Sequence, residues 1–336
     1  MERSMSGLEG FVDKPSLKNY WYAVALSDDV SLAPIAIKLL GEEFVIWREP
    51  DGGLIAAEEK CPHRQAPLSH GIIENGCLVC PYHGWSFGKS GKCTNIPSSA
   101  EGVPIPKRAH LKTFDLIEKY GLIWLCIGKP ISPLFELKEE LDPAFRRINT
   151  EVQKWQVAAT RMVDNFLDIT HFPYVHLGTF GAGQDTKVPN ITLEYLDDYF
   201  FGYRYEVLAA NPEEARNTSG SDAESVERSM TSGFNLPLTV RSTIAYKSGL
   251  EHIILLLSTP IDETSSYFTF VVWRNDDFSI PAEEIISFDR AIGEEDRVML
   301  EKLNGLMPLG KTALVNVQSD KATVEWRRQL LALING

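Results

Sequence analysis

The sequences CPHR at residues 61–64 and CPYHGW at residues 80–85 decide the fold of the first third of this chain. Each contributes one cysteine and one histidine, spaced C-x-H and C-x2-H, and sixteen residues lie between His63 and Cys80. Thiolates and imidazoles bind zinc or iron, so the spacing alone allows a four-ligand zinc site. We expect these two loops to hold a metal centre through Cys61, His63, Cys80 and His83.

The arrangement of the ligands favours an iron–sulfur cluster over zinc. Zinc sites with this ligand set more often pair cysteine with cysteine and histidine with histidine at short spacing. Here each loop supplies one of each. In a Rieske [2Fe-2S] centre two cysteines hold one iron and two histidines hold the other. Two equivalent Cys/His loops on opposite sides of the cluster fit that requirement.

Short apolar or alternating runs surround both loops and predict strands, among them Ile35–Leu40, Glu43–Arg48 and Leu122–Ile127. Residues 17–130 are therefore expected to form a small all-β domain, preceded by a loose leader at residues 1–16. A proline-containing stretch, Gly128–Pro133, is typical of a domain boundary.

A second group of candidate ligands follows some ninety residues later, at Asp168, His171 and His176. Asp168 and His171 are three apart and share a face of a predicted helix over residues 160–177. His171 and His176 are about 140° apart around an ideal helix, at 100° per residue. We expect Pro173 to bend the helix so that both imidazoles reach one ion. Without a metal, the same pattern describes a helix end with two incidental histidines.

A carboxylate ligand is expected from the helix that begins near Pro281 and runs to about Asn304. Asp296 falls within the apolar stripe of that helix, closer to its centre than Glu295. A buried carboxylate is costly unless it is paired or bound to a metal. Two histidines and one carboxylate are typical of non-haem iron(II) sites that activate oxygen. The alternative is a helix-end aspartate at the edge of the core.

The remainder of the chain, residues 131–336, predicts a second domain of the α+β class, with an antiparallel sheet flanked by helices. Strands are expected within 192–208 and 234–274, and a further helix over Lys321–Leu333. Residues 211–232 are polar and predict a mobile surface loop, or a lid over a substrate pocket.

Composition narrows the class of partner. The net charge is -13, which argues against nucleic acid and anionic membranes. The sequence has no apolar run of about 20 residues, and its first residues lack an apolar signal core. We expect a cytoplasmic protein whose five cysteines are ligands or thiols rather than disulfides. His70, His110 and His252 are expected to be structural.

CPHR and CPYHGW resemble the cluster motifs of the Rieske non-haem iron oxygenases. The extra cysteines of respiratory Rieske proteins are replaced by Ala66 and Tyr82, so the resemblance is to the oxygenase branch. The pattern D-x2-H-x4-H with a late E-D-x-V resembles the mononuclear iron site of that family. The resemblance covers Trp21 to Leu331. It is greatest to the homotrimeric group that includes vanillate, dicamba and caffeine demethylases and saxitoxin-pathway hydroxylases.

The resemblance implies roles for individual residues. The iron ligands of the family correspond to His171, His176 and Asp296, and its bridging aspartate to Asp168. In the family this aspartate links an iron-ligand histidine to a cluster-ligand histidine of the neighbouring subunit, here His171 and His83. The cofactors implied are a [2Fe-2S] cluster and mononuclear Fe(II).

The activity that the resemblance implies is a monooxygenase acting on a small organic substrate with O2, by hydroxylation or oxidative demethylation. The sequence has no convincing flavin or nicotinamide fingerprint, so electrons are expected from a separate NAD(P)H-dependent reductase or ferredoxin. The alternatives are a cis-dihydroxylating dioxygenase, a pure electron-transfer Rieske protein and a zinc-stabilised binding protein.

Overall fold

The computed structural model describes residues 10–31, 33–182, 184–310 and 314–336. The chain divides into two compact units. One is Leu17–Pro133, and the other begins at Leu134 and also takes the residues before Leu17. Each unit is described by itself below.

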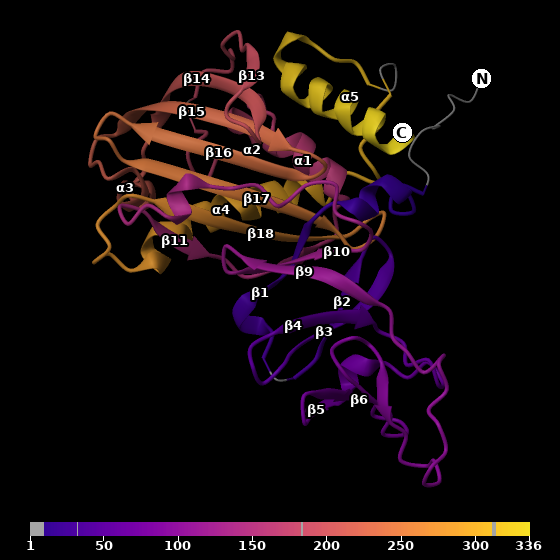
Figure 1. The fold of residues 1–336 in the computed structure, drawn as a ribbon. Helices are drawn as coiled ribbons and strands as arrows, with labels where there is room; N and C mark the ends of the chain where they lie inside the picture. Colours follow the sequence, from indigo (N-terminus) through magenta and orange to yellow (C-terminus); the bar gives the residue numbers. More distant parts are fainter. Residues whose placement is uncertain (1–9, 32, 183, 311–313) are drawn as a thin grey trace, which may run out of the picture. The chain divides into compact units, whose positions relative to one another are not determined.

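The first unit is built on a six-stranded antiparallel sheet (Figure 1). Its strands are neighbours in the order β1 (Tyr22–Leu26), β10 (Leu122–Cys126), β9 (Thr113–Lys119), β4 (Leu54–Glu58), β3 (Glu42–Arg48) and β2 (Ile35–Leu39). Strand β10 is buried throughout, whereas β9 alternates between exposed and half-buried positions. The strands predicted from apolar runs are all present.

A smaller four-stranded sheet carries the two Cys/His loops. Its strands are β5 (Ile72–Glu74), β6 (Cys77–Val79), β7 (Ser86–Phe87) and β8 (Cys93–Asn95). Cys61 and Cys80 are part of the hydrophobic core between the two sheets, together with Trp47, Leu78 and Phe87. Short 3-10 helices of this unit lie at Ser27–Asp29 and Leu68–His70, and a third, Pro15–Asn19, crosses the start of the unit at Leu17. The prediction of an N-terminal all-β domain is confirmed.

The second unit is built on an eight-stranded antiparallel sheet. Seven strands follow one another in the order β11 (Arg146–Asn149), β18 (Ser266–Arg274), β17 (Glu251–Pro260), β16 (Thr239–Tyr246), β15 (Ser225–Asn235), β14 (Phe201–Ala210) and β13 (Leu193–Tyr195), while β12 (Gln153–Trp155) also pairs with β18. Figure 1 shows the long strands β14–β18 side by side. An antiparallel sheet flanked by helices was predicted, and this is confirmed.

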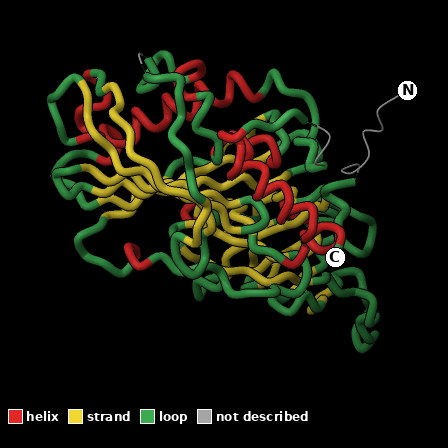
Figure 2. Tube along the Cα trace, turned by 90° about the horizontal axis from the view of Figure 1, so that it is seen from above, coloured by secondary structure: helices red, strands yellow, loops and turns green. Residues whose placement is uncertain are grey.

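Helices lie outside the strand layer, as Figure 2 shows. They are α1 (Ala159–Phe166), α2 (Phe172–Val175), α3 (Arg216–Ser219), α4 (Ala282–Leu300) and α5 (Lys321–Asn335), with 3-10 turns at Lys138–Glu140, Glu213–Ala215 and Gln318–Asp320. The core of the unit joins Met162 of α1 and Ile285 of α4 to Phe268 of β18. None of the helices in the described part of the chain is both long and apolar enough to cross a membrane.

Two predictions about local structure were wrong. Residues 211–232 are not one loop, because β15 begins at Ser225 and pairs on both sides, with β14 and β16. The polar side chains of β15 misled the prediction. The helix predicted over 160–177 is two helices, and the chain leaves α1 at Leu167. Pro173 lies in the first turn of α2, where a missing N–H costs nothing, so it begins a helix rather than bending one.

The predicted leader falls partly outside the described residues, which begin at Gly10. Phe11 and Val12 are buried, and the N–H of Val12 donates to Glu263 at 3.0 Å. Residues 10–16 therefore pack as part of the second unit.

Candidate functional site

The two Cys/His loops have the same backbone design. The N–H of Cys61 donates to the carbonyl of Ala66 at 3.0 Å, and that of Cys80 donates to the carbonyl of Trp85 at 2.8 Å. The fourth residue after each cysteine has a left-handed backbone, with φ of 58° at Gln65 and 71° at Gly84. The loops are thus matched turns, each closed onto its own cysteine.

Cysteines and histidines occupy different environments in these loops. Cys61 and Cys80 are buried, whereas His63 and His83 are exposed, with ring centroids 4.5 Å apart. The ring of His63 stacks on that of Trp85 at 4.5 Å and an interplanar angle of 7°. Burial raises the pKa of the Cys61 thiol to about 11, so a metal is needed to keep it as a thiolate at neutral pH. A cluster with a cysteine end and a histidine end fits this division.

In the second unit, three ligand atoms converge. His171 Nε2 lies 3.2 Å from His176 Nε2, and Asp296 Oδ1 lies 3.5 Å and 3.4 Å from these two nitrogens. Donor atoms about 2.1 Å from one ion lie roughly 3.0–3.4 Å apart at angles between octahedral and tetrahedral. The triangle formed by His171, His176 and Asp296 therefore has the size of a metal site, and it is consistent with a mononuclear iron site.

A carboxylate lies next to the Nδ1 atom of each of the two histidines, on the side of the ring opposite Nε2. His171 Nδ1 lies 2.9 Å from Asp168 Oδ2, and His176 Nδ1 lies 3.1 Å from Glu295 Oε2. A carboxylate only accepts, so each Nδ1 carries the proton and each Nε2 presents a lone pair. Such supports orient metal-binding histidines in many proteins. Without a metal ion, the lone pairs of two neutral imidazoles would face the carboxylate oxygen of Asp296, so a proton on His171 Nε2 has to take the place of the metal.

The carboxylates are themselves fixed by hydrogen bonds. Asp168 accepts from the N–H and the hydroxyl of Thr170, at 3.0 Å and 2.8 Å, and Glu295 accepts from the Thr179 hydroxyl at 2.7 Å. Burial lowers the pKa of His171, but the carboxylates of Asp168 and Asp296 outweigh burial and raise it to about 9. For His176 burial dominates and lowers its pKa, although Asp296 opposes it. The site therefore favours a cation, and His171 holds a proton when no metal is bound.

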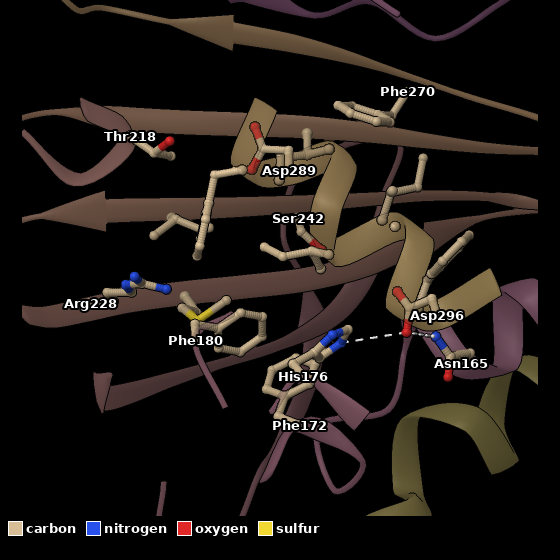
Figure 3. Close-up of a pocket in the computed structure, with 18 of the residues that line it drawn as sticks. Asn165, Phe172, His176, Phe180, Thr218, Arg228, Ser242, Phe270, Asp289 and Asp296 are labelled. Carbon is tan, nitrogen blue, oxygen red and sulfur yellow. Dashed lines mark hydrogen bonds and ion pairs between the residues drawn. The ribbon is translucent and has the colours of Figure 1, made fainter. Parts of the chain in front are cut away.

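A cavity of about 130 Å³ opens beside this group (Figure 3). His171, His176 and Asp296 line one end of it. The rest is mostly apolar, with many aromatic side chains, and it is bounded by the sheet and by α1, α2 and α4. Residues that line it include Phe166, Phe172, Phe180, Met230, Ile254, Leu256, Phe268, Phe270 and Phe288.

Several functional contacts were not found from the sequence. Glu295 was considered only as a rival of Asp296 for the metal, yet it supports His176. Asn165 donates from Nδ2 to Asp296 Oδ1 at 2.9 Å and joins α1 to α4. Its position beside Asp164 in the sequence gave no sign of this role. The apolar stripe of the helix after Pro281 was predicted to consist of Ile285, Phe288, Ile292, Met299 and Leu303. Ile285 and Phe288 are buried, whereas Met299 and Leu303 are exposed, and Leu300 is buried instead.

Comparison with known families gives two matches. Residues 20–115 match the Rieske [2Fe-2S] domain, and residues 155–336 match the vanillate O-demethylase oxygenase C-terminal domain. The second match covers more than half of the chain. Together they take in the two Cys/His loops and all three residues of the His–His–Asp group.

Individual relatives match nearly the whole chain. The chain is 28% identical to methylxanthine N1-demethylase NdmA of Pseudomonas putida, over 96% of this chain and 90% of that protein. It is 27% identical to the vanillate O-demethylase oxygenase subunit of a Pseudomonas species, over 93% of each. The structure of Pseudomonas putida CBB5 NdmA with caffeine superposes with a TM-score of 0.81 at 25% identity, covering 96% of this chain and 93% of that one.

Proposed function

This chain belongs to the family of Rieske oxygenases related to the vanillate O-demethylase oxygenase, and on that premise we propose that it hydroxylates or oxidatively demethylates a small organic substrate with O2. As an oxygenase component it works with a reductase, which we take to be a separate NAD(P)H-dependent reductase or ferredoxin.

The proposal assigns the ligands residue by residue. Cys61 and Cys80 hold one iron of the [2Fe-2S] cluster, and His63 and His83 hold the other. The three-residue group of the second unit holds the mononuclear iron through His171, His176 and Asp296. When bound there, this iron supplies the reductive activation of O2.

One observation carries the proposal. The lone pairs of His171 and His176 face each other and Asp296, at the end of an apolar cavity. The three acceptor atoms need a cation between them, a metal ion or, in its absence, a proton on His171, and the cavity provides a dry space beside it for an organic molecule. A pure electron-transfer protein would need neither feature.

The side chains of the chain have separate tasks in the reaction. Asp168 and Glu295 keep the proton on Nδ1 of their histidines, which leaves Nε2 free for the metal. The aromatic side chains around the cavity exclude water and hold the substrate. The overall balance is one O2, two electrons and two protons, which give the hydroxylated substrate and one water. If the target is an O- or N-methyl group, the hydroxylated product breaks down to formaldehyde and the demethylated substrate.

We further propose a homotrimer in a head-to-tail ring, an arrangement that closes when the contacts are heterologous. In it, Asp168 would connect His171 to His83 of the neighbouring subunit, as the resemblance implies. The short Asp168–His171 contact and the bonds from Thr170 hold this carboxylate in a single orientation.

The test is a screen of small methylated and aromatic compounds with a surrogate reductase. Formaldehyde or a hydroxylated product, formed with NAD(P)H consumption and lost in His176→Ala, is the expected result. A cis-diol would identify a dioxygenase instead. A colourless protein containing zinc and no acid-labile sulfide would overturn the proposal.

Asp168→Asn tests the bridging role separately. We expect both metal centres to remain bound and turnover to fall about 100-fold, the upper end of the 10- to 100-fold effect of carboxylates that hydrogen-bond metal-binding histidines. Iron and sulfide analysis should match the unmodified protein. Full turnover in this variant would remove Asp168 from the electron path.

A further inference from the structure

The wall of the cavity opposite the His–His–Asp group carries one unusual side chain, Arg228. It lies on β15, where alternate residues point to the same face, so Arg228 and Met230 both line the cavity. Tyr246 of β16 lies directly opposite Arg228 in the sheet. Figure 3 shows Arg228 across the cavity from Asp296, with Phe180 near it.

Arg228 is buried without a charged partner. Its exposed fraction is 5%, and its Nε has no hydrogen-bond partner. No carboxylate among the described residues forms an ion pair with it. Its guanidinium lies 5.9 Å from the ring of Phe180 and 5.8 Å from that of Tyr246. These rings interact with the positive charge of Arg228 but do not accept hydrogen bonds from its N–H groups. The N–H donors of the guanidinium therefore remain available to another group.

The nearby charged groups are already engaged with one another. Asp289, which also lines the cavity, has its Oδ2 3.1 Å from Nε2 of the buried His252, an ion-pair distance although these two atoms form no hydrogen bond. Nδ1 of His252 accepts from Arg274 at 2.9 Å, so Nε2 carries the proton that faces Asp289. Arg274 and Arg146 in turn share Asp276, at 2.8 Å and 2.7 Å. These groups neutralise one another, so none of them neutralises the positive charge of Arg228.

A buried, unpaired arginine is costly, because a charge in an apolar environment loses its hydration. A cavity that keeps one is suited to an anionic ligand, and the planar fork of arginine binds carboxylates through two parallel hydrogen bonds. This cost is offset only when such a ligand is present.

The position of Arg228 also defines the length of the ligand. Phe180 stands between Arg228 and His176, and its ring lies 4.9 Å from the imidazole of His176. Because the Phe180 ring lies 5.9 Å from the guanidinium and 4.9 Å from the imidazole, the guanidinium of Arg228 and the ring of His176 are at most about 11 Å apart. One substituted aromatic ring spans such a distance.

We infer that Arg228 is a specificity-determining residue that binds an oxyanion, a carboxylate or a sulfonate, on a small aromatic substrate. The oxyanion lies at the end of the ring remote from the carbon that is oxidised. This inference rests on the proposed function, because it assigns the cavity beside the His–His–Asp group to the substrate.

The experiment measures binding by calorimetry to the full chain with its metals, without a reductase, so that no turnover occurs. The ligands are the three methoxybenzoates, the matching methoxybenzenesulfonates and the uncharged methoxybenzamides. The variants are Arg228→Met, Arg228→Lys and the control Arg204→Met, an exposed arginine paired with Glu194. Ligand-induced shifts of the unfolding temperature provide a second measure and show whether each variant is folded.

At least one acid should bind roughly 10- to 100-fold more tightly than its amide, the scale of a charge-assisted hydrogen bond. Arg228→Met should remove this difference by weakening the acid alone, Arg228→Lys should keep part of it, and Arg204→Met should keep all of it. Carboxylates and sulfonates tested in parallel show which oxyanion fits.

Three results would overturn the inference: no acid binds, acid and amide bind equally, or Arg228→Met weakens both alike. If Arg228→Met does not fold, Arg228→Lys and the acid-to-amide ratio of the unmodified protein still decide. Failure of the proposed function is a separate outcome, seen as acids that bind through Arg228 but give neither formaldehyde nor hydroxylated product with a reductase.

Discussion

The two candidate metal centres are built in opposite ways. The Cys/His site repeats one local design, a turn closed onto Cys61 and a matching turn closed onto Cys80. The His–His–Asp site is assembled from the segment after α1 and from α4, more than a hundred residues later. In the first, the cysteines belong to the hydrophobic core. In the second, each histidine depends on a separate carboxylate.

Because of this difference, we expect the loss of a ligand to affect folding at the first site and only the chemistry at the second. A ligand that is also a core residue couples metal binding to the stability of its unit. A ligand that lines a cavity and relies on hydrogen bonds can be lost while the sheet behind it remains intact. Three substitutions test this contrast, and their expected effects decrease in the order Cys61→Ser, Asp296→Ala and Glu295→Gln.

Cys61→Ser should have the largest effect, because it removes a cluster ligand from the core of the first unit. We expect loss of the visible absorption of the cluster, loss of turnover and a fall of more than about 4 kcal/mol in the free energy of unfolding. Urea unfolding followed by circular dichroism measures the stability. Cys77→Ser is the control, since Cys77 is half-buried and its Sγ contacts Thr94. Unchanged stability in Cys61→Ser would remove the coupling.

Asp296→Ala should abolish turnover but leave the fold in place. The side chain is buried and accepts a hydrogen bond from Asn165, and in the metal-free protein it also faces the protonated His171. We expect iron to fall from about three to about two atoms per chain, with the cluster absorption kept and the unfolding temperature of the metal-free protein lowered by only a few degrees. A loss of cluster absorption as well would show that the two sites are not independent.

Glu295→Gln should give the smallest effect of the three. The amide keeps the size of the side chain but has only one acceptor oxygen, so its NH2 group must face either His176 Nδ1 or the N–H of Gly178, which both donate to Glu295. Metal affinity should therefore fall roughly 10- to 100-fold. Titration of the metal-free protein with Fe(II) or Co(II) measures it. Glu294→Gln is the matched control, because Glu294 is exposed and pairs with Arg297. Equal affinities in the two variants would rule out the supporting role of Glu295.

The two sites also differ in how much of their structure can be predicted from the sequence. The strands around the Cys/His loops are short apolar or alternating runs bounded by turns, and both loops are short contiguous motifs, so their positions were predictable. His171, His176 and Asp296 were also identified, because metal chemistry limits the residue types that serve. Glu295 and Asn165 were missed because their roles depend on which helix faces which, and spacing along one segment does not contain that information.

Polar side chains led to a wrong prediction for β15, a strand that lines part of the cavity. Arg228, Ser229 and Ser232 made residues 211–232 look like a surface loop, yet β15 pairs along both edges within the large sheet. A strand that faces a ligand cavity does not need the apolar alternation of a strand that faces the core. Pro173 was misread for a related reason, since a proline that begins a helix and one that bends a helix have the same local sequence.

The twin turns of the first unit differ in what they tolerate, although their backbones match. A Cβ added at Gly84 would lie 3.0 Å from Cγ of Pro97, whereas Gln65 already carries a side chain in the same left-handed conformation and projects it into solvent. Position 65 is thus a place to attach a reporter group or a linker to an electrode near the exposed histidines. Position 84 is closed to any such modification.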